Sequence, residues 1–213
     1  MRRVIYYLSI TIILFSTIII SKEVFSQEKD DRIYAFNKSI FSAKEGDYNK
    51  SLNDLLSIYD KYSNDYLINL RLGYLFYLTK NYDKSINHYK KALSILNNKS
   101  IEPLLGLTLP YAAKENWSEV EKIYLQILSI DPVNYTANLR LGQIYFNRKE
   151  YYKAEKYLQK VFELYPSDYE ANLYLGWTYF YLNRKSEAKE RFIYVLMISP
   201  NDQSANEGLK LVK

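Results

Sequence analysis

The sequence repeats itself every 34 residues over most of its length. Five residues of one stretch are followed 34 positions later by the same residue types: Leu141, Gly142, Tyr145, Ala154 and Pro166 match Leu175, Gly176, Tyr179, Ala188 and Pro200. A fixed period of this size indicates stacked copies of one supersecondary unit, each of which buries its apolar faces against its neighbours. With one extra residue near positions 97–100, the register extends backwards and gives five repeats: 32–65, 66–100, 101–134, 135–168 and 169–202.

Each repeat has the hydrophobic pattern of two amphipathic helices. In the fourth repeat, two stripes occur at helical spacing, namely Asn138, Leu141, Gly142 and Tyr145, then Ala154, Leu158, Val161 and Phe162. A chain with 6 glycines and 5 prolines but 24 tyrosines favours long helices over a many-turned sheet protein. Because a lone helix pair cannot bury both its faces, the pattern predicts that the pairs stack on one another in an all-α protein.

Small residues and prolines set the packing and the ends of these helices. We expect Gly142 to face Ala154, and Gly176 to face Ala188, so that the helix axes approach closely. Pro110 is expected to kink the first helix of the third repeat. A proline, which cannot donate the next helical hydrogen bond, follows the second helix of the last three repeats at Pro132, Pro166 and Pro200.

The residue order within a repeat resembles that of the tetratricopeptide repeat family. The fifth repeat carries the family pattern most fully, with Leu175-Gly176, Tyr179, Ala188, Phe192 and Pro200. Departures from the pattern occur at Asn69, Asn138 and Asn172 for the first aromatic, Thr108 for the glycine, and Ser51 and Ser85 for the alanine. The resemblance covers residues 32–202 and implies a right-handed α-solenoid of about five helix-turn-helix repeats, with residues 203–213 as a short C-terminal capping segment that includes a helix.

The first 26 residues have the features of an export signal. Arg2 and Arg3 precede an uncharged apolar run over residues 4–20, and Val24-Phe25-Ser26 supplies a small residue before a cleavage point. We expect residues 1–26 to be a signal peptide, or an N-terminal membrane anchor if uncleaved, followed by a short polar linker at 27–31. In both cases the remainder is predicted to be extracytoplasmic, periplasmic or secreted, with bacterial export favoured.

The residue inventory argues against catalysis and cofactors. The chain has no cysteine and one histidine, and it lacks a phosphate-binding loop, a metal-ligand spacing and a nucleophile elbow, so we predict no enzymatic activity, no metal site and no cofactor. His88 is expected to be a solvated residue, and Glu119 and Glu121 to be surface charges. The net charge of +5 is spread among interleaved acidic residues, which predicts no nucleic-acid partner.

The family resemblance also implies which residues face the inner curve of the solenoid. These are Leu70, Leu105, Leu109, Leu139, Leu173 and Tyr181 together with ten candidate partner-binding residues: Arg71, Tyr74, Tyr77, Arg140, Gln143, Phe146, Asn147, Tyr174, Trp177 and Phe180. Tyrosine, tryptophan and arginine dominate binding hot spots, and amides can bond a peptide backbone. The alternative is that several of these rings only pack against the adjoining repeat.

These features together predict a non-enzymatic scaffold that binds a protein or peptide partner in its concave groove. The positions of the family's clamp for a C-terminal carboxylate carry only one suitable group, Arg140, so that mode of recognition is not expected. Membrane contact is expected only through the N-terminal segment if it is retained. The alternative function is a self-assembling structural component of the cell envelope, acting through exposed solenoid ends.

Overall fold

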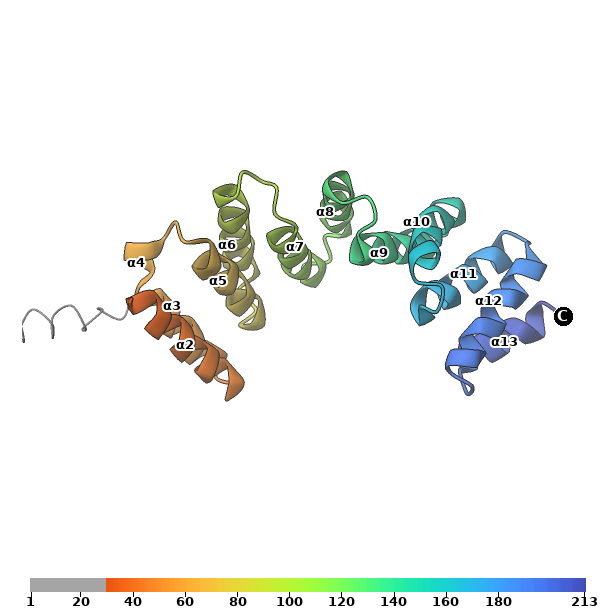
Figure 1. The fold of residues 1–213 in the computed structure, drawn as a ribbon, viewed down its shortest axis with the longest axis horizontal. Coiled ribbons are helices and arrows are strands. Elements are labelled where there is room, and N and C mark those ends of the chain that lie inside the picture. The colour runs from red at the N-terminus through yellow and green to blue at the C-terminus, as the bar shows by residue number, and fades with distance from the viewer. Residues whose placement is uncertain (1–29) are drawn as a thin grey trace, which may run out of the picture. The chain divides into compact units, whose positions relative to one another are not determined.

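The computed structural model describes residues 30–213, and every regular element in that range is a helix. Consecutive helices pack in pairs (Figure 1), which confirms the all-α solenoid prediction. The helices are α2 (Asp31–Lys44), α3 (Tyr48–Leu56), α4 (Tyr59–Tyr62), α5 (Tyr66–Leu78), α6 (Tyr82–Ile95), α7 (Ile101–Ala113), α8 (Trp117–Ile130), α9 (Tyr135–Asn147), α10 (Tyr151–Leu164), α11 (Tyr169–Tyr181), α12 (Lys185–Ile198) and α13 (Gln203–Leu211).

The predicted export segment at residues 1–26 lies outside the described residues, as do positions 27–29 of the predicted linker. Within residues 30–213, no helix combines the length and apolar character that crossing a membrane requires. The described chain forms two compact units, one that ends at Ser63 and one that runs from Asn64 to Lys213. The first unit contains α2 to α4, and the second contains α5 to α13.

The first unit has a polar seam between α2 and α3. The Ser51 hydroxyl, which stands in place of the family alanine, donates to the Ser39 carbonyl at 2.7 Å. The Ser42 hydroxyl donates to Asp54 Oδ2 at 2.8 Å, and Lys38 Nζ lies 2.9 Å from Asp54 Oδ1. Burial alone would raise the pKa of the Asp54 carboxyl, but the bonds from Lys38 and Ser42 outweigh it and hold the pKa below its ordinary value.

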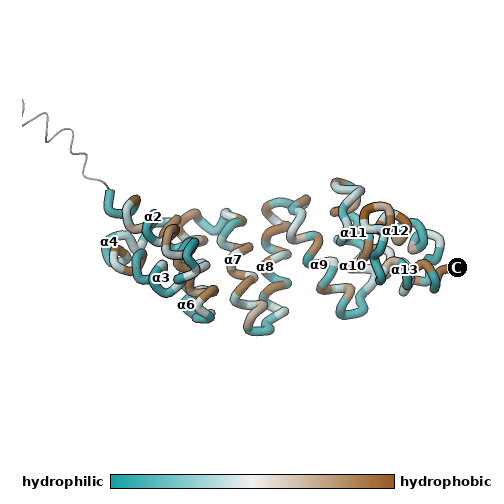
Figure 2. Tube along the Cα trace, turned by 90° about the horizontal axis from the view of Figure 1, so that it is seen from below, coloured by the Kyte–Doolittle hydropathy of each residue, from teal (hydrophilic) through white to brown (hydrophobic). Residues whose placement is uncertain are grey.

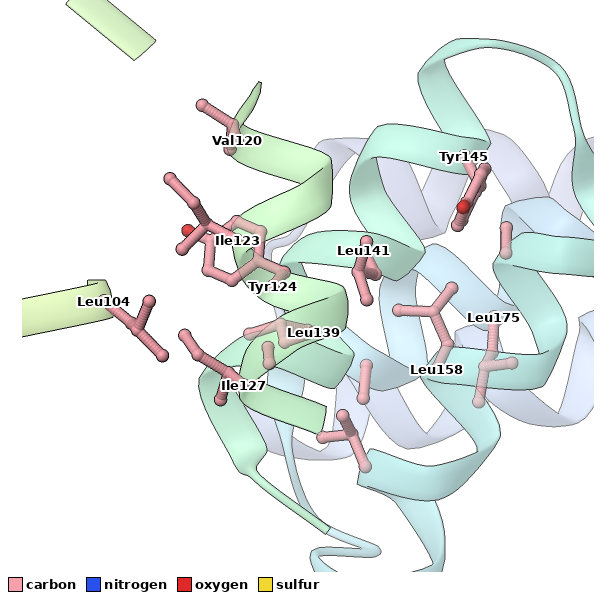
Figure 3. Close-up of a cluster of buried hydrophobic side chains, with 14 of the residues drawn as sticks. Leu104, Val120, Ile123, Tyr124, Ile127, Leu139, Leu141, Tyr145, Leu158 and Leu175 are labelled. Carbon is pink, nitrogen blue, oxygen red and sulfur yellow. The ribbon is translucent and has the colours of Figure 1, made fainter. Parts of the chain in front are cut away.

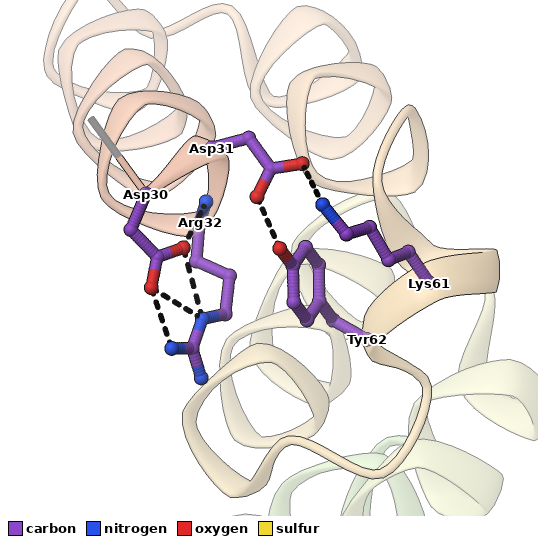
Figure 4. Close-up of polar contacts among 5 residues, drawn as sticks. All are labelled: Asp30, Asp31, Arg32, Lys61 and Tyr62. Atoms are coloured by element: carbon purple, nitrogen blue, oxygen red, sulfur yellow. Dashed lines mark hydrogen bonds and ion pairs between the residues drawn. The ribbon is translucent and has the colours of Figure 1, made fainter. Parts of the chain in front are cut away.

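The start of α2 is fixed to α4 by a second polar cluster (Figure 4). The Asp31 carboxylate accepts hydrogen bonds from the Tyr62 hydroxyl and from Lys61 Nζ, the latter at 3.0 Å. Asp30 caps the helix by accepting from the Arg32 backbone N–H at 3.0 Å, and its carboxylate also pairs with the Arg32 guanidinium. These contacts tie the short α4 to the beginning of the hairpin.

In the second unit, each second helix packs between two first helices. Thus α6 contacts α5 and α7, α8 contacts α7 and α9, α10 contacts α9 and α11, and α12 contacts α11 and α13. Hydrophobic stretches recur along α7 and α8 (Figure 2), and α7 continues through the buried Pro110. Buried side chains from α6 to the C-terminal end form one continuous core (Figure 3), which includes Leu104, Ile127, Leu139, Leu141, Leu158 and Leu175.

Glycines in the first helices make room for large side chains of the second helices. A Cβ on Gly142 would lie 2.5 Å from Leu158 Cγ, and one on Gly176 would lie 2.6 Å from Phe192 Cε1. The space that each glycine leaves is therefore filled by the bulky residue one turn further along the second helix. This finding corrects the facing residues expected from the sequence, Ala154 and Ala188, which are buried one turn earlier.

Two rings of the second unit are enclosed by glycines from two successive repeats. Tyr89 lies against Gly73 and Gly106, and a Cβ on either glycine would come within 3 Å of the ring. Phe192 is enclosed in the same way, by Gly176 and by a glycine of α13, Gly208. Since neither ring would fit beside larger residues, these glycines allow one aromatic side chain to fill the junction between two repeats.

The turn between the two helices of a repeat has a constant form. In each repeat, one residue with a positive φ lies in this turn: Gly46, Lys80, Glu115, Lys149 and Asn183. These residues are 34 positions apart, except that Lys80 and Glu115 are 35 apart. Two further residues with positive φ, Asn97 and Asn98, lie between α6 and α7, where the sequence carries its extra residue.

Buried asparagines replace the first aromatic of the family pattern because they bond the start of their own helix. Asn172 Nδ2 donates to the carbonyls of Pro166 and Asp168, both at 2.8 Å. Its Oδ1 accepts from Arg191 Nη1 of α12 at 3.1 Å. The equivalent residue Asn138 donates to the carbonyls of Pro132 and Asn134, and Asn69 donates to that of Asp65. These departures from the family pattern are thus fully bonded polar elements of the core.

Tyrosines at the start of first helices connect successive repeats. The Tyr135 hydroxyl donates to Asp168 Oδ2 at 2.7 Å, while Asp168 Oδ1 accepts from the Ala171 backbone N–H and caps α11. Tyr169 and Asp202 repeat the arrangement at the start of α13, with a hydroxyl distance of 2.6 Å. Burial and the bond to Asp168 raise the pKa of Tyr135 to about 12, so it stays a donor at neutral pH.

His88 is half-buried, which corrects the expectation that it is solvated. Its Nδ1 lies 3.1 Å from Asn69 Oδ1, and its ring stacks on Phe76 with centroids 5.1 Å apart. Burial lowers the pKa of His88 to about 4, and the nearby charges of Lys91 and Lys84 act in the same direction. The periodicity placed His88 correctly on the second helix, but the neighbouring ring that covers it belongs to α5.

We therefore expect His88 to be neutral in the folded protein down to about pH 4. The unfolded chain takes up this proton near pH 6.5, so the free energy of unfolding should rise with pH between about 4 and 6.5. NMR titration of the single histidine ring measures its pKa directly. The His88→Gln variant should lose this component of the pH dependence, and a measured pKa near 6.5 would contradict the buried placement.

The structure also corrects the expectation that Glu121 is a surface charge, because its carboxylate is bonded to residues of another helix. The Tyr145 hydroxyl donates to Glu121 Oε1 at 2.5 Å, and Arg148 pairs with the other oxygen. The bond from Tyr145, more than the charge of Arg148, holds the pKa of the Glu121 carboxyl below its ordinary value. Glu121 therefore links α8 to α9, whereas Glu119 pairs with Lys122 on its own helix at 2.5 Å.

Candidate functional site

The ten predicted partner-binding residues lie on first helices of the second unit, and none of them is buried. Leu139, a further position assigned to the inner surface, is only 1% exposed and belongs to the core. It is therefore not available to a partner, because α9 turns this residue towards neighbouring helices. The ten residues divide among three helices: Arg71, Tyr74 and Tyr77 on α5, Arg140, Gln143, Phe146 and Asn147 on α9, and Tyr174, Trp177 and Phe180 on α11.

An aromatic hollow of about 330 Å³ lies between α9, α11 and α13. The ring centroids of Phe146 and Tyr174 are 5.3 Å apart with an edge-to-face geometry, and Tyr151 stacks on Tyr181 at 4.7 Å. Such ring pairs hold each other in place, which keeps the hollow open in a fixed shape. We call this site the aromatic hollow, and its lining residues are Phe146, Leu173, Tyr174, Trp177, Tyr181 and Ser204.

Trp177 is held on two sides within the aromatic hollow. Its indole Nε1 donates to Ser204 Oγ of α13 at 2.8 Å, and its ring meets Phe192 at 5.1 Å. The bond satisfies the one polar atom of the indole and leaves the apolar ring to line the hollow. Sequence reasoning missed Ser204, because it treated the C-terminal helix only as a cap.

A second hollow of about 290 Å³ lies between α7, α8 and α9. Arg140 Nη1 donates to Gln143 Oε1 at 2.7 Å and lies 3.7 Å from Glu170 Oε1, with both charged side chains nearly half exposed. The hollow combines an apolar floor with these polar groups. We call it the junction hollow, and its lining residues are Thr108, Leu109, Ala112, Trp117, Val120, Tyr124, Arg140, Gln143, Ile144 and Asn147.

The two hollows lie on either flank of α9, and each is lined by different members of the predicted set. The aromatic hollow contains Phe146, Tyr174 and Trp177, and the junction hollow contains Arg140, Gln143 and Asn147. The remaining four predicted residues, Arg71, Tyr74, Tyr77 and Phe180, line neither hollow.

The α5 residues form a separate exposed aromatic group. Tyr74 is 43% exposed, and its ring lies 6.5 Å from that of Tyr77, which in turn lies 6.2 Å from Tyr82. Burial lowers the pKa of Arg71, but a guanidinium stays charged throughout the physiological range. The structure thus separates this group from the two hollows around α9. Across residues 30–213, no cluster of three or more histidine, cysteine, aspartate or glutamate side chains is placed to hold a metal ion.

Family models match two segments of the chain. Residues 67–97 and residues 135–168 each match a tetratricopeptide repeat model. The two segments contain α5 with α6, and α9 with α10, which are both helix pairs of the second unit. No curated protein matches the sequence.

Solved structures of tetratricopeptide repeat proteins share the fold. A tetratricopeptide repeat protein from Parabacteroides merdae is 20% identical with a TM-score of 0.73, over 85% of this chain and 72% of that one. MamA from Desulfovibrio magneticus RS-1 is 17% identical with a TM-score of 0.69, over 82% and 98%. YrrB, described as having an unusual peptide-binding site, is 16% identical with a TM-score of 0.67, over 89% and 97%. The chain therefore contains tetratricopeptide repeats and has the α-solenoid fold of the proteins built from them.

Proposed function

We propose that this protein is a non-enzymatic scaffold that holds a polypeptide partner against α9 and α11, outside the cytoplasm. The tetratricopeptide fold indicates a protein–protein interaction scaffold. The aromatic hollow carries the finer proposal, because it is an apolar cavity with fixed walls and an open mouth.

The size and lining of the aromatic hollow suit one large apolar side chain. Its volume of about 330 Å³ lies at the lower end of the range for ligand pockets, so it accepts a side chain more readily than a large cofactor. Tyrosine and tryptophan rings supply contact area at a low entropic cost, since few torsions are fixed on binding. Ring pairs such as Tyr151 with Tyr181 already fix them in the unbound protein.

Polar groups beside the hollow suit a peptide backbone. Gln143 and Asn147 lie on the same helix as Phe146, and the amide of Asn147 is exposed. An amide side chain both donates and accepts, so it can satisfy the paired N–H and C=O groups of an extended peptide. The peptide-binding site named for the structural neighbour YrrB is in accord with this proposal.

The extracytoplasmic part of the proposal rests on residues 1–26. The pair Arg2 and Arg3, followed by an uncharged run at residues 4–20, is the pattern of an export signal or anchor. A reporter enzyme that is active only outside the cytoplasm, fused after Lys213, tests this location. Reporter activity that does not depend on residues 1–26 would contradict it.

The binding proposal is tested by site-specific photocrosslinking in cells. A photoreactive residue at Tyr181, which lines the aromatic hollow and is 51% exposed, should give a discrete adduct with a polypeptide. The same residue at Tyr152, which is 77% exposed on α10, is the control position. In a Trp177→Ala background the Tyr181 adduct should fall roughly thirtyfold, the loss expected for a hot-spot side chain of about 2 kcal/mol.

The outcomes of this experiment separate the candidate functions. An adduct at Tyr181 that is unchanged by Trp177→Ala, in a chain with unchanged helical circular dichroism, would rule out the aromatic hollow as the binding site. An adduct with a second copy of this chain would instead support self-assembly. That alternative is favoured by exposed apolar side chains near the C-terminal end, such as Ile193, Met197 and Leu211.

A further inference from the structure

We propose that the junction hollow is a second subsite of the same polypeptide site and takes an acidic side chain of the partner. In the partner's sequence, this acidic residue would lie about three or four positions from the apolar residue whose side chain enters the aromatic hollow. This inference rests on the proposed function, and it adds the charge and the spacing of the bound segment.

The junction hollow lies where both flanking positions lack a glycine, whereas every other junction between first helices of the second unit has at least one. Tyr89 and Phe192 each lie between two glycines, and Tyr124 is the equivalent ring of the third repeat. The positions that flank Tyr124 in the repeat register hold Thr108 and Arg140, and all three residues line the hollow. With a side chain at both positions, this junction lacks the close approach that one or two glycines allow at the others.

Helix packing in the second unit agrees with this explanation. The first helices of neighbouring repeats contact each other directly in the pairs α5 with α7, α9 with α11, and α11 with α13. The remaining pair, α7 with α9, has little or no such direct packing. Three residues of α8 therefore form part of the lining: the exposed Trp117 and the buried Val120 and Tyr124.

Arg140 gives the junction hollow its charge preference, since it is the one charged residue among the lining side chains. Its nearest acidic group is Glu170, at 3.7 Å, and the two side chains are 47% and 41% exposed. An exposed ion pair at this distance contributes little, so a partner carboxylate that approaches more closely can replace Glu170. The guanidinium then offers two parallel donors to the incoming carboxylate.

The spacing between the two side chains follows from α9. Phe146 and Asn147 are neighbours on this helix, yet they line different hollows. A polypeptide that fills both must therefore cross a helix about 10 Å wide. An extended chain advances about 3.3 Å per residue, which places the acidic side chain roughly three or four residues from the apolar one.

The chain contains two tryptophans, and each lines one hollow. Trp117 lies in the junction hollow and Trp177 in the aromatic hollow. The variants Trp117→Phe and Trp177→Phe each leave a single fluorescent reporter and keep a ring at the changed position. Occupancy of the two hollows can therefore be followed separately.

The test uses acetylated nine-residue peptides of alanine and serine with one phenylalanine and one glutamate, separated by two to six positions, and matched peptides with glutamine. Glutamate at a separation of three or four should bind roughly tenfold more tightly than glutamine, with a response from Trp117 as well as Trp177. Arg140→Gln should abolish the tenfold preference. Glu170→Gln, which removes the competing carboxylate, should increase it.

The experiment distinguishes a failure of the second subsite from a failure of the proposed function. A response from Trp177 alone, with equal affinity for glutamate and glutamine peptides and no effect of Arg140→Gln, would overturn the second subsite and leave the aromatic hollow intact. The absence of any response from Trp177 would count against the proposed function itself. A preference for glutamate at every separation would refute the spacing, since it would show a general attraction of charge.

Discussion

Replacing Phe192 with alanine is expected to lower the free energy of unfolding of the second unit by about 3–5 kcal/mol. The ring is fully buried and fills the space between Gly176 and Gly208. Because neither glycine has a side chain that can move into the vacated volume, the cavity should persist and add to the lost transfer free energy. The edge of Trp177, whose centroid is 5.1 Å away, loses its packing surface as well.

Urea unfolding followed by circular dichroism and by tryptophan fluorescence measures this loss. Phe41→Ala is the matched control, because Phe41 lies in a helix of the first unit and is 64% exposed, so its loss should cost about 0.5 kcal/mol or less. A loss below about 1 kcal/mol for Phe192→Ala would mean that the helices close over the vacated space. The glycine-enclosed ring would then not be a fixed element of the junction.

Asn172→Ala should have the second largest effect, a loss of about 2–4 kcal/mol. The substitution leaves the carbonyls of Pro166 and Asp168 without their side-chain donor at a position that is fully buried. It also removes the oxygen that accepts from Arg191, a guanidinium that is 8% exposed. A buried charge that loses a partner adds to the cost.

Asn206 provides the matched control for this prediction. Its Nδ2 donates to the Asp202 carbonyl at 2.8 Å, the same bond that Asn172 makes to Asp168, but in an exposed place where water can replace it. Asn206→Ala should therefore cost about 1 kcal/mol or less. Equal losses for the two variants in denaturant unfolding would show that burial of the Asn172 bonds is not what matters.

The sequence predicts the repeating helix pairs because the residues that define them act locally. The stripe of Asn138, Leu141, Gly142 and Tyr145 is buried, as its helical spacing requires. The prolines follow the second helices two positions after Ile130, Leu164 and Ile198. Helix periodicity thus identifies the face that is buried, since it depends only on residues within one helix.

Periodicity does not identify what lies opposite that face. Leu139 is on the inner stripe by register but is buried, and His88 is on the outer stripe but stacks on a ring of α5. Both outcomes depend on the distance and rotation of another helix, which the periodicity of one helix does not define. The division of the predicted surface into two hollows has the same origin, although the missing glycine at Thr108 was visible as a break in the repeat pattern.

The tyrosine at the start of each of two first helices has a mechanical consequence. Asp168 uses one oxygen to cap α11 and the other to hold Tyr135, and Asp202 serves α13 and Tyr169 in the same way. When the repeat that begins at the aspartate frays, the tyrosine at the start of the preceding first helix loses its hydrogen-bond acceptor. Under a pulling force applied at Lys213, the last repeats should therefore unfold one after another from the C-terminal end, because each repeat that unfolds removes a hydrogen bond from the preceding repeat.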